Sequence, residues 1–211
     1  MALPLPAPDR AATVARLRAH LQQVAPVRAA PVVDRLPTGH AGLDARVGGL
    51  PRAGVTVVEG APGSGRLGVV LPALGALTRA GRAVAVVDVP GWLHPPGLDG
   101  VCLDSLLLVR PGEPRALWAA EQLARCEGLA LVLVLDPPPF RALGRRLVHA
   151  AEEGRTSVVL LSEAPQADLP AALHLRCLAA GRVEILRARG ARPGTVALGC
   201  PAGPIRATLS R

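Results

Sequence analysis

The chain has 211 residues, half of them hydrophobic, and carries 24 basic against 16 acidic side chains, which gives a formal net charge of +8. This length suits one compact globular domain with its own core. No apolar run approaches the roughly 18 residues of a membrane-spanning helix, and the N-terminus lacks the pattern of a secretory signal, so we expect a cytoplasmic protein without membrane contact.

The first predicted element is an amphipathic helix over Asp9–Val24. Its apolar side chains recur at helical spacing, at Val14, Leu17, Leu21 and Val24. Pro26 and Pro31 forbid continuation of that helix, so residues 25–34 are predicted to be an extended linker. The chain is therefore expected to consist of an N-terminal helix and linker over residues 1–34 and a core domain over residues 35–211.

Short β-branched runs alternate with helical stretches from Val55 onward. Strands are predicted at Val55–Val58, Ala83–Val87, Leu106–Val109, Leu129–Leu135 and Ser157–Leu161, and helices at Leu67–Ala80, Glu113–Arg125 and Phe140–Glu153. This alternation predicts an α/β fold with a mainly parallel sheet flanked by helices on both faces. Shorter strands, predicted at Val183–Arg187, Thr195–Leu198 and Ile205–Leu209, indicate an antiparallel C-terminal extension.

Aromatic side chains are scarce, at 1% of the chain, which disfavours domains that stack nucleic-acid bases. The basic residues are all arginine and are scattered, which favours a generic basic surface over a dedicated nucleic-acid groove. The four cysteines lie far from one another and from histidines at metal-ligand spacing, so we expect no metal site and reduced, mostly buried thiols. They are Cys102, Cys126, Cys177 and Cys200.

A glycine-rich segment, GAPGSGRL over Gly60–Leu67, directly follows a predicted strand and opens a predicted helix. This is the order of a phosphate-binding loop, in which backbone N–H groups surround phosphate oxygens at a helix N-terminus. However, Arg66 stands where such loops have lysine, and Leu67 where they have the hydroxyl that binds magnesium. The sequence favours a loop kept as a turn, with nucleotide binding without hydrolysis as the alternative.

Two aspartates follow predicted strands and have two interpretations each. Asp136 comes after Leu129–Leu135, where phosphate-loop enzymes place the acid that orients magnesium, but three prolines follow it, so a strand-ending turn is equally favoured. Asp88 is ambiguous in the same way. The histidines have no nucleophile at a recognised spacing, so we assign no catalytic residue. The candidate vestigial nucleotide site is Gly60, Gly63, Ser64, Gly65, Arg66 and Asp136.

Three arginines near the end of the chain form a second candidate site. Arg187 and Arg189 alternate on the segment VEILRAR, so both are expected on one face of a strand, and Arg192 follows in the next loop. These side chains either contact an anion or a partner protein, or form a solvated strand end.

Taken in order, the segments LPTGHAGLDARVGGLPRAGVTVVEGAPGSGR, VAVVDVPGWLHPP, SLLLVRPGEPRALWAAEQLA, LALVLVLD and VEILRARGARPG resemble the RecA recombinase core. The resemblance spans roughly Leu36–Gly199. The segments LPTGH, GSGR and LLLVRP…ALWAAEQ are most similar to the ImuA family. These RecA-like accessory proteins belong to DNA-damage-induced mutagenesis cassettes that also supply a polymerase-like protein and an error-prone polymerase.

The resemblance implies roles for several positions. Gly60, Gly63, Gly65 and Arg66 match the RecA-like phosphate loop, and Asp136 matches its acidic strand end. Pro90 falls where that family has its catalytic glutamate. The positions of Arg187 and Arg189 are those of two basic residues that reach the nucleotide of a neighbouring subunit. Because lysine, hydroxyl and glutamate are all replaced, we expect no enzymatic activity, no required cofactor and at most weak ATP binding.

Loop lengths bear on DNA binding, because RecA-type proteins hold single-stranded DNA with two loops. Nearly all of 136–156 is needed for the helix Phe140–Glu153, so the first loop is expected to be absent. The interval 162–181 has room for a short second loop but contains Arg176 as its only basic residue. Since strand binding needs several phosphate contacts, we expect at most weak DNA binding.

These observations lead to a non-catalytic RecA-like adaptor in SOS translesion mutagenesis. It would contact RecA, the polymerase-like and error-prone polymerase components, or both, and would dock through residues 9–34. The main alternative is a RecA-superfamily ATPase in DNA repair, using Arg66 and a magnesium site of Asp136 and Asp88, with weak DNA binding. A DNA-binding module using the basic surface and a cell-division inhibitor of the SOS response are further alternatives.

Overall fold

The computed structural model describes residues 34–95, 98–138, 144–166 and 169–199. The predicted N-terminal helix, nearly all of the linker after it, the last predicted strand and Cys200 lie outside these residues. The predicted helix Phe140–Glu153 is described from Gly144 onward, as α5 (Gly144–Glu153).

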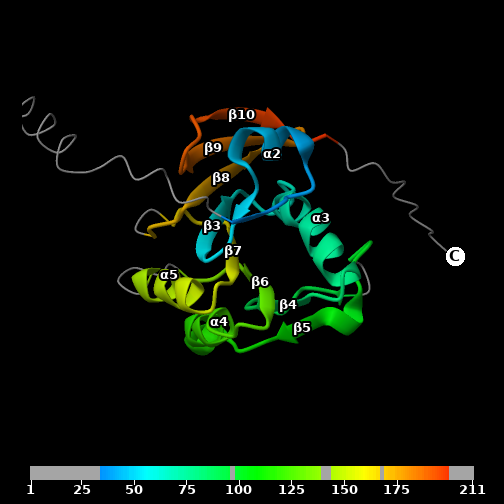
Figure 1. The fold of residues 1–211 in the computed structure, drawn as a ribbon, viewed down its shortest axis with the longest axis vertical. Coiled ribbons are helices and arrows are strands. Elements are labelled where there is room, and N and C mark those ends of the chain that lie inside the picture. The colour runs from blue at the N-terminus through cyan, green and yellow to red at the C-terminus, as the bar shows by residue number, and fades with distance from the viewer. Residues whose placement is uncertain (1–33, 96–97, 139–143, 167–168, 200–211) are drawn as a thin grey trace, which may run out of the picture. The chain divides into compact units, whose positions relative to one another are not determined.

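An eight-stranded sheet forms the centre of the described part, with the order β10-β9-β8-β3-β7-β6-β4-β5 (Figure 1). Its strands are β3 (Gly54–Glu59), β4 (Ala83–Asp88), β5 (Leu106–Val109), β6 (Leu129–Leu135), β7 (Ser157–Ser162), β8 (Leu173–Leu178), β9 (Arg182–Ala188) and β10 (Gly194–Ala197). All neighbours from β8 to β5 are parallel, whereas β9 and β10 are antiparallel additions at one edge. The predicted α/β fold with an antiparallel C-terminal extension is confirmed.

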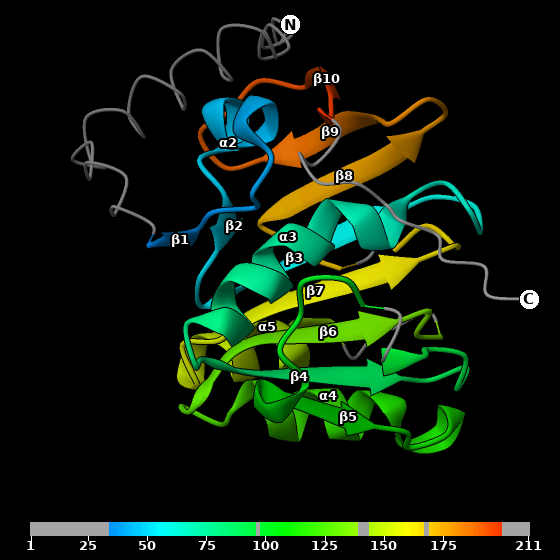
Figure 2. The same cartoon turned by 90° about the vertical axis from the view of Figure 1, so that its right-hand side faces the viewer.

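Helices cover both faces of this sheet. α3 (Arg66–Arg79) lies on one face, and α4 (Ala116–Ala124) and α5 lie on the other (Figure 2). Two 3-10 turns, η2 (Leu103–Ser105) and η3 (Glu113–Arg115), precede β5 and α4. None of the described helices combines the length and apolar character needed to cross a bilayer.

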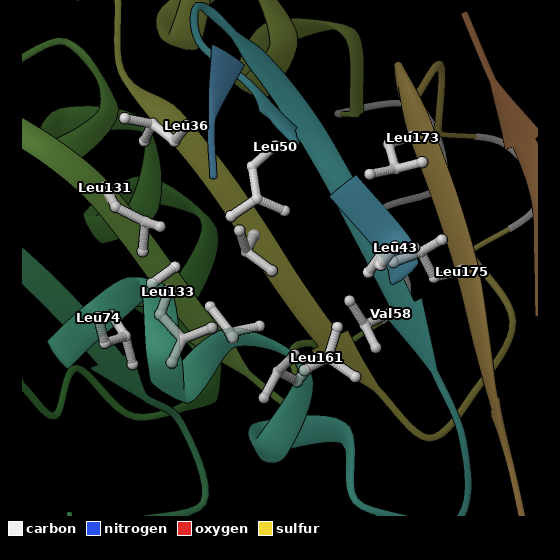
Figure 3. Close-up of a cluster of buried hydrophobic side chains, with 14 of the residues drawn as sticks. Leu36, Leu43, Leu50, Val58, Leu74, Leu131, Leu133, Leu161, Leu173 and Leu175 are labelled. Atoms are coloured by element: carbon white, nitrogen blue, oxygen red, sulfur yellow. The ribbon is translucent and has the colours of Figure 1, made fainter. Parts of the chain in front are cut away.

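The alternation of side chains along the strands divides the apolar interior into two layers. On β6, Leu131, Leu133 and Leu135 pack on the α3 side, whereas Val132 and Val134 pack on the side of α4 and α5. Figure 3 shows the first of these layers, where leucines from β6, β8 and α3 meet. Burial on both faces explains why these strands are continuous apolar runs in the sequence.

A small unit before β3 was not predicted. It consists of β1 (Arg35–Leu36), α2 (Ala41–Val47) and β2 (Leu50–Pro51), with β1 and β2 paired antiparallel. Its elements are too short to carry a periodic signal. The structure thus adds two short paired strands, joined by a helix, ahead of the first long strand.

The interval 162–181, in which we expected room for a short second loop, contains a strand that was not predicted, β8. This strand alternates buried and more exposed residues, and the polar His174 and Arg176 interrupt its apolar pattern. It pairs with β3 in parallel and with β9 antiparallel. Consequently only the segment 163–172 connects β7 to β8, and Arg176 lies on a strand rather than in a candidate DNA loop.

The expectation of mostly buried cysteines is also wrong for the three that are described. Cys177 on β8 is buried, Cys102 is half-buried and Cys126 is exposed. Cys126 follows α4 in a turn, where its Sγ lies 3.3 Å from the Gln122 carbonyl oxygen and close to solvent. All three are free thiols.

Candidate vestigial nucleotide site

The glycine-rich loop connects β3 to α3 at the carboxyl edge of the parallel strands. Gly63 and Gly65 have φ values of 77° and 88°, the left-handed region that glycine adopts without a Cβ penalty. Gly60 is needed for another reason, because a Cβ there would collide with the Ser64 side chain and lie 3.0 Å from the Cys177 Cβ. Each of these three glycines therefore stands where a side chain would be unfavourable.

Arg66, the first residue of α3, turns toward Asp136 rather than toward the space inside the loop. Its Nη1 donates to Asp136 Oδ1, and its Nη2 donates to Oδ2 at 3.2 Å. β7 lies between β3 and β6 in the sheet. The contact therefore spans the end of β7, because Arg66 follows β3 and Asp136 follows β6. The Arg66 side chain is 9% exposed and that of Asp136 is 26% exposed. A bidentate, largely desolvated pair of this kind is among the stronger ionic contacts in proteins.

The Asp136 carboxylate also accepts a backbone hydrogen bond. The backbone N–H of Glu163, which follows β7, donates to its Oδ1 at 3.1 Å. The Asp136 N–H in turn donates to the Leu161 carbonyl oxygen at 2.8 Å, and Asp136 has a left-handed φ of 41°. The structure therefore brings Arg66 and Asp136 together as the sequence suggested, but each now neutralises the charge of the other.

The N-terminus of α3 still offers an electropositive end. Its first turn contains no acidic residue, and Gly65 caps it without a side-chain hydrogen bond. Such an end attracts anions through its free N–H groups and its dipole. The first helical residue, Arg66, is engaged by Asp136.

Asp88 lies at the end of β4, next to the end of β6, so the two candidate magnesium ligands do share one edge of the sheet. Its carboxylate, however, is fully buried and already accepts three hydrogen bonds. The donors are the backbone N–H groups of Gly91 and Leu93, at 3.0 and 3.1 Å, and Arg110 Nε at 3.0 Å. This carboxylate organises the turn after β4, where Pro90 is exposed.

Metal ligands do not gather elsewhere in the described ranges, which contain no group of three or more His, Cys, Asp or Glu side chains able to hold an ion. The Arg66–Asp136 pair is thus the main chemical feature at this edge of the sheet.

A buried polar cluster beside the loop was missed by the sequence analysis. Glu59, the last residue of β3, is 4% exposed. Its Oε1 lies 2.6 Å from His174 Nε2 and accepts the Gln166 N–H at 3.1 Å, while its Oε2 lies 3.6 Å from Arg176 Nη2. The signal available in the sequence was a lone acid closing an otherwise apolar strand. The cluster ties the loop-bearing end of β3 to β8.

Cys177 lies on β8 against the loop, with its Cβ 3.0 Å from the position that a Cβ on Gly60 would take. Burial raises the pKa of its thiol to about 11, against the opposing influences of the Arg66 charge and the Ser64 hydroxyl. The thiolate is the nucleophilic form, so this thiol is unreactive near neutral pH.

A pH prediction follows from the raised pKa of Cys177. We expect iodoacetamide to modify Cys126 at pH 8 and to spare Cys177, which mass spectrometry of peptides would show. Because the folded pKa exceeds the unfolded value of 9.0, this thiol's contribution to stability is present below pH 9 and is lost as the pH rises toward 11. Cys177→Ser should reduce that alkaline loss, whereas equal labelling of the two cysteines in the folded protein would contradict the assignment.

The arginines of the second candidate site lie at the other end of the parallel strands, near the starts of β3 and β8. Arg187 is in β9, and Arg189 follows its end, one residue beyond Ala188. Both line one cavity together with Ala188 and the segment Pro170–Ala172. That their side chains share one face of the strand stays a prediction. Arg192 is exposed but is not among the lining residues. The Ala172 N–H donates to the Val55 carbonyl oxygen, at the start of β3, which lies roughly 16 Å along the strand from Gly60.

Sequence comparison relates part of this chain to RecA proteins. It is 34% identical over 108 residues to Protein RecA of Tropheryma whipplei (strain Twist), a match that covers 48% of this chain and 24% of that protein. The chain is a RecA-like relative. It is also 37% identical over 108 residues to Protein RecA of Streptomyces ambofaciens, covering 48% of this chain and 29% of that protein, and 34% identical over 110 residues to that of Frankia alni, covering 49% and 32%.

The matches therefore span 24% to 32% of the length of these RecA proteins. No model of a known protein family matches the chain. The mainly parallel sheet flanked by helices is consistent with a RecA-like core, in agreement with the sequence similarity.

Proposed function

We propose that this RecA-like chain is a non-catalytic adaptor of the ImuA kind that acts in SOS translesion mutagenesis. It would work by protein contact with RecA, with the polymerase-like and error-prone polymerase components of the cassette, or with both. The observation that carries the proposal is the bidentate ion pair between Arg66 and Asp136 in the glycine-rich loop.

Phosphoryl transfer needs a cation on the outer phosphates and a magnesium ion oriented by an acid. In this chain the residue at the cation position binds the residue at the acid position, and Glu163 N–H occupies the same carboxylate. Leu67 offers no hydroxyl for magnesium. Nucleotide would have to break a desolvated ion pair before it could use either side chain, which disfavours both tight binding and turnover.

The exposed apolar surface supports an adaptor role. Both tryptophans of the chain are exposed, Trp92 by 53% and Trp118 by 61%, together with Leu103 and Leu107. Leu107 belongs to β5, the strand at the edge of the sheet opposite β10, as Figure 2 also shows. Exposed tryptophans, and an exposed leucine on the edge strand of a sheet, are each typical of surfaces that bind other proteins.

Two measurements on the full chain test the proposal. Titration calorimetry with ATP and magnesium and a phosphate-release assay, with and without single-stranded DNA, should give at most weak binding and no turnover. Affinity capture with purified RecA, and separately with the two polymerase components, should recover at least one of them. ATP turnover that is abolished by Asp136→Ala would overturn the proposal.

A surface prediction accompanies that capture experiment. Trp118→Ala is expected to weaken partner capture by about tenfold or more, because exposed tryptophans commonly dominate protein interfaces. His149→Ala, on the exposed side of α5, is the matched control and should leave capture unchanged. Equal capture by both variants would remove Trp118 from the interface.

One observation favours the alternative of an ATP-binding protein or ATPase in DNA repair. The loop keeps the left-handed glycines and the uncapped helix N-terminus that surround phosphates in working sites. This alternative would require ATP to displace Arg66 from Asp136. A saturable, magnesium-dependent ATP affinity that is lost in Asp136→Asn would support it over the adaptor.

A further inference from the structure

We propose that the cavity lined by the segments Arg187–Arg189 and Pro170–Ala172 binds an acidic peptide segment of a partner protein, with a carboxylate held between the guanidinium groups of Arg187 and Arg189. The cavity has a volume of about 320 Å³. The inference builds on the adaptor role proposed above and names the chemistry of one of its contacts.

The walls of the cavity are fixed by the sheet. Its apolar side is the segment Pro170–Ala172, which directly precedes β8. Its basic side is formed by Arg187 and Arg189 at the end of β9, the antiparallel neighbour of β8. The Arg189 N–H donates to the Ala172 carbonyl oxygen at 3.2 Å, and the Ala172 N–H is bonded to Val55. The two arginines are therefore presented from a backbone that is held in place on both sides, which limits the entropy lost on binding.

Positive charge at this edge is not compensated within the described part of the chain. No described carboxylate forms an ion pair with Arg187 or Arg189. Arg35 adds to the charge, since its Nη2 donates to the Arg189 carbonyl oxygen at 3.1 Å. Burial, followed by the Arg189 charge, lowers the pKa of Arg35 from its usual value. A bound carboxylate would relieve this repulsion between like charges.

Outside the described residues, the chain has few acidic side chains. Residues 1–33 contain four arginines and one acid, Asp9, and residues 200–211 contain two arginines and no acid. Asp168 is the one acid in the remaining gaps, 96–97, 139–143 and 167–168. A second copy of the chain would bring another net charge of +8. Charge complementarity therefore points to a different, acidic molecule.

An acidic peptide fits the cavity better than a nucleic acid does. The wall Pro170–Ala172 is apolar, and no aromatic side chain among the lining residues could stack on a base. A carboxylate side chain flanked by aliphatic residues would satisfy the guanidinium groups and cover the apolar wall at once. A phosphodiester backbone would leave that wall without a partner.

The test uses the full chain and a short fluorescein-labelled peptide of alternating glutamate and leucine, followed by fluorescence anisotropy. We expect this peptide to bind, and its glutamine counterpart to bind at least about tenfold more weakly. Arg187→Ala/Arg189→Ala should lower the affinity for the glutamate peptide by at least about tenfold. Arg182→Ala, an exposed arginine at the other end of β9, should not change it.

Three results would overturn the inference: no binding of the glutamate peptide, equal binding of the glutamine peptide, or unchanged affinity in the double variant. Labelled single-stranded DNA, tested in parallel, would replace the peptide as the ligand if it alone binds and the double variant abolishes that binding. RecA capture that persists without peptide binding contradicts only the cavity assignment. Peptide binding without capture of any cassette component or RecA contradicts only the adaptor function. Thermal unfolding confirms that the variants are folded.

Discussion

Arg66→Ala is expected to lower the free energy of unfolding by about 2 kcal/mol. The substitution leaves the Asp136 carboxylate, whose side chain is only 26% exposed, without its bidentate partner. Part of the loss is offset because water can still reach Asp136, so the effect stays below that of a fully buried pair. Urea unfolding followed by circular dichroism measures it.

Two comparisons make this prediction specific. The double variant Arg66→Ala/Asp136→Ala should be less destabilised than the sum of the two single variants, because the pair acts as a unit. Arg125→Ala, which removes a partly exposed ion pair with Glu153, should change stability by less than about 0.5 kcal/mol. Additive effects of the two single substitutions would show that the pair contributes nothing to stability and would weaken the case for a closed phosphate loop.

Glu59→Ala is expected to lower the free energy of unfolding by about 3 kcal/mol. This carboxylate is buried and contacts His174, Arg176 and the Gln166 N–H, so its removal leaves buried polar groups without an acceptor. Because Gln166 lies in the segment between β7 and β8, that segment should also lose protection. Hydrogen exchange measured by mass spectrometry would detect faster exchange around residue 166.

The matched control is Glu184→Ala on β9. Glu184 also pairs with Arg176, at 3.5 Å, but its side chain is 37% exposed, so the expected loss is below about 0.5 kcal/mol. If the two glutamate variants lose equal stability, then the contacts of Glu59 contribute no more to the free energy of unfolding than an exposed ion pair does. Unchanged exchange in the segment 163–172 would have the same meaning.

Much of the sheet could be predicted because its signal is local. The run Leu129–Leu135 became β6 with the same bounds, since a strand buried on both faces needs an unbroken apolar sequence. β8 escaped prediction because one side of it carries His174 and Arg176, which look like loop residues until Glu59 is known to lie beside them. Polar partners inside the fold thus concealed a strand that the apolar pattern alone could not reveal.

In both candidate sites, the sequence predicted local features but not the contacts between distant residues. The spacing of Gly60, Gly63 and Gly65 identified a phosphate-type loop, and the replacements at Arg66 and Leu67 already marked it as altered, because loop geometry and helix start are properties of adjacent residues. That Arg66 binds Asp136, 70 positions further on, depends on β7 lying between β3 and β6. The cavity at Arg187 and Arg189 likewise exists only because β8 and β9 pair as neighbours. Periodicity is encoded along the chain, whereas contacts between distant side chains depend on the order in which the strands assemble.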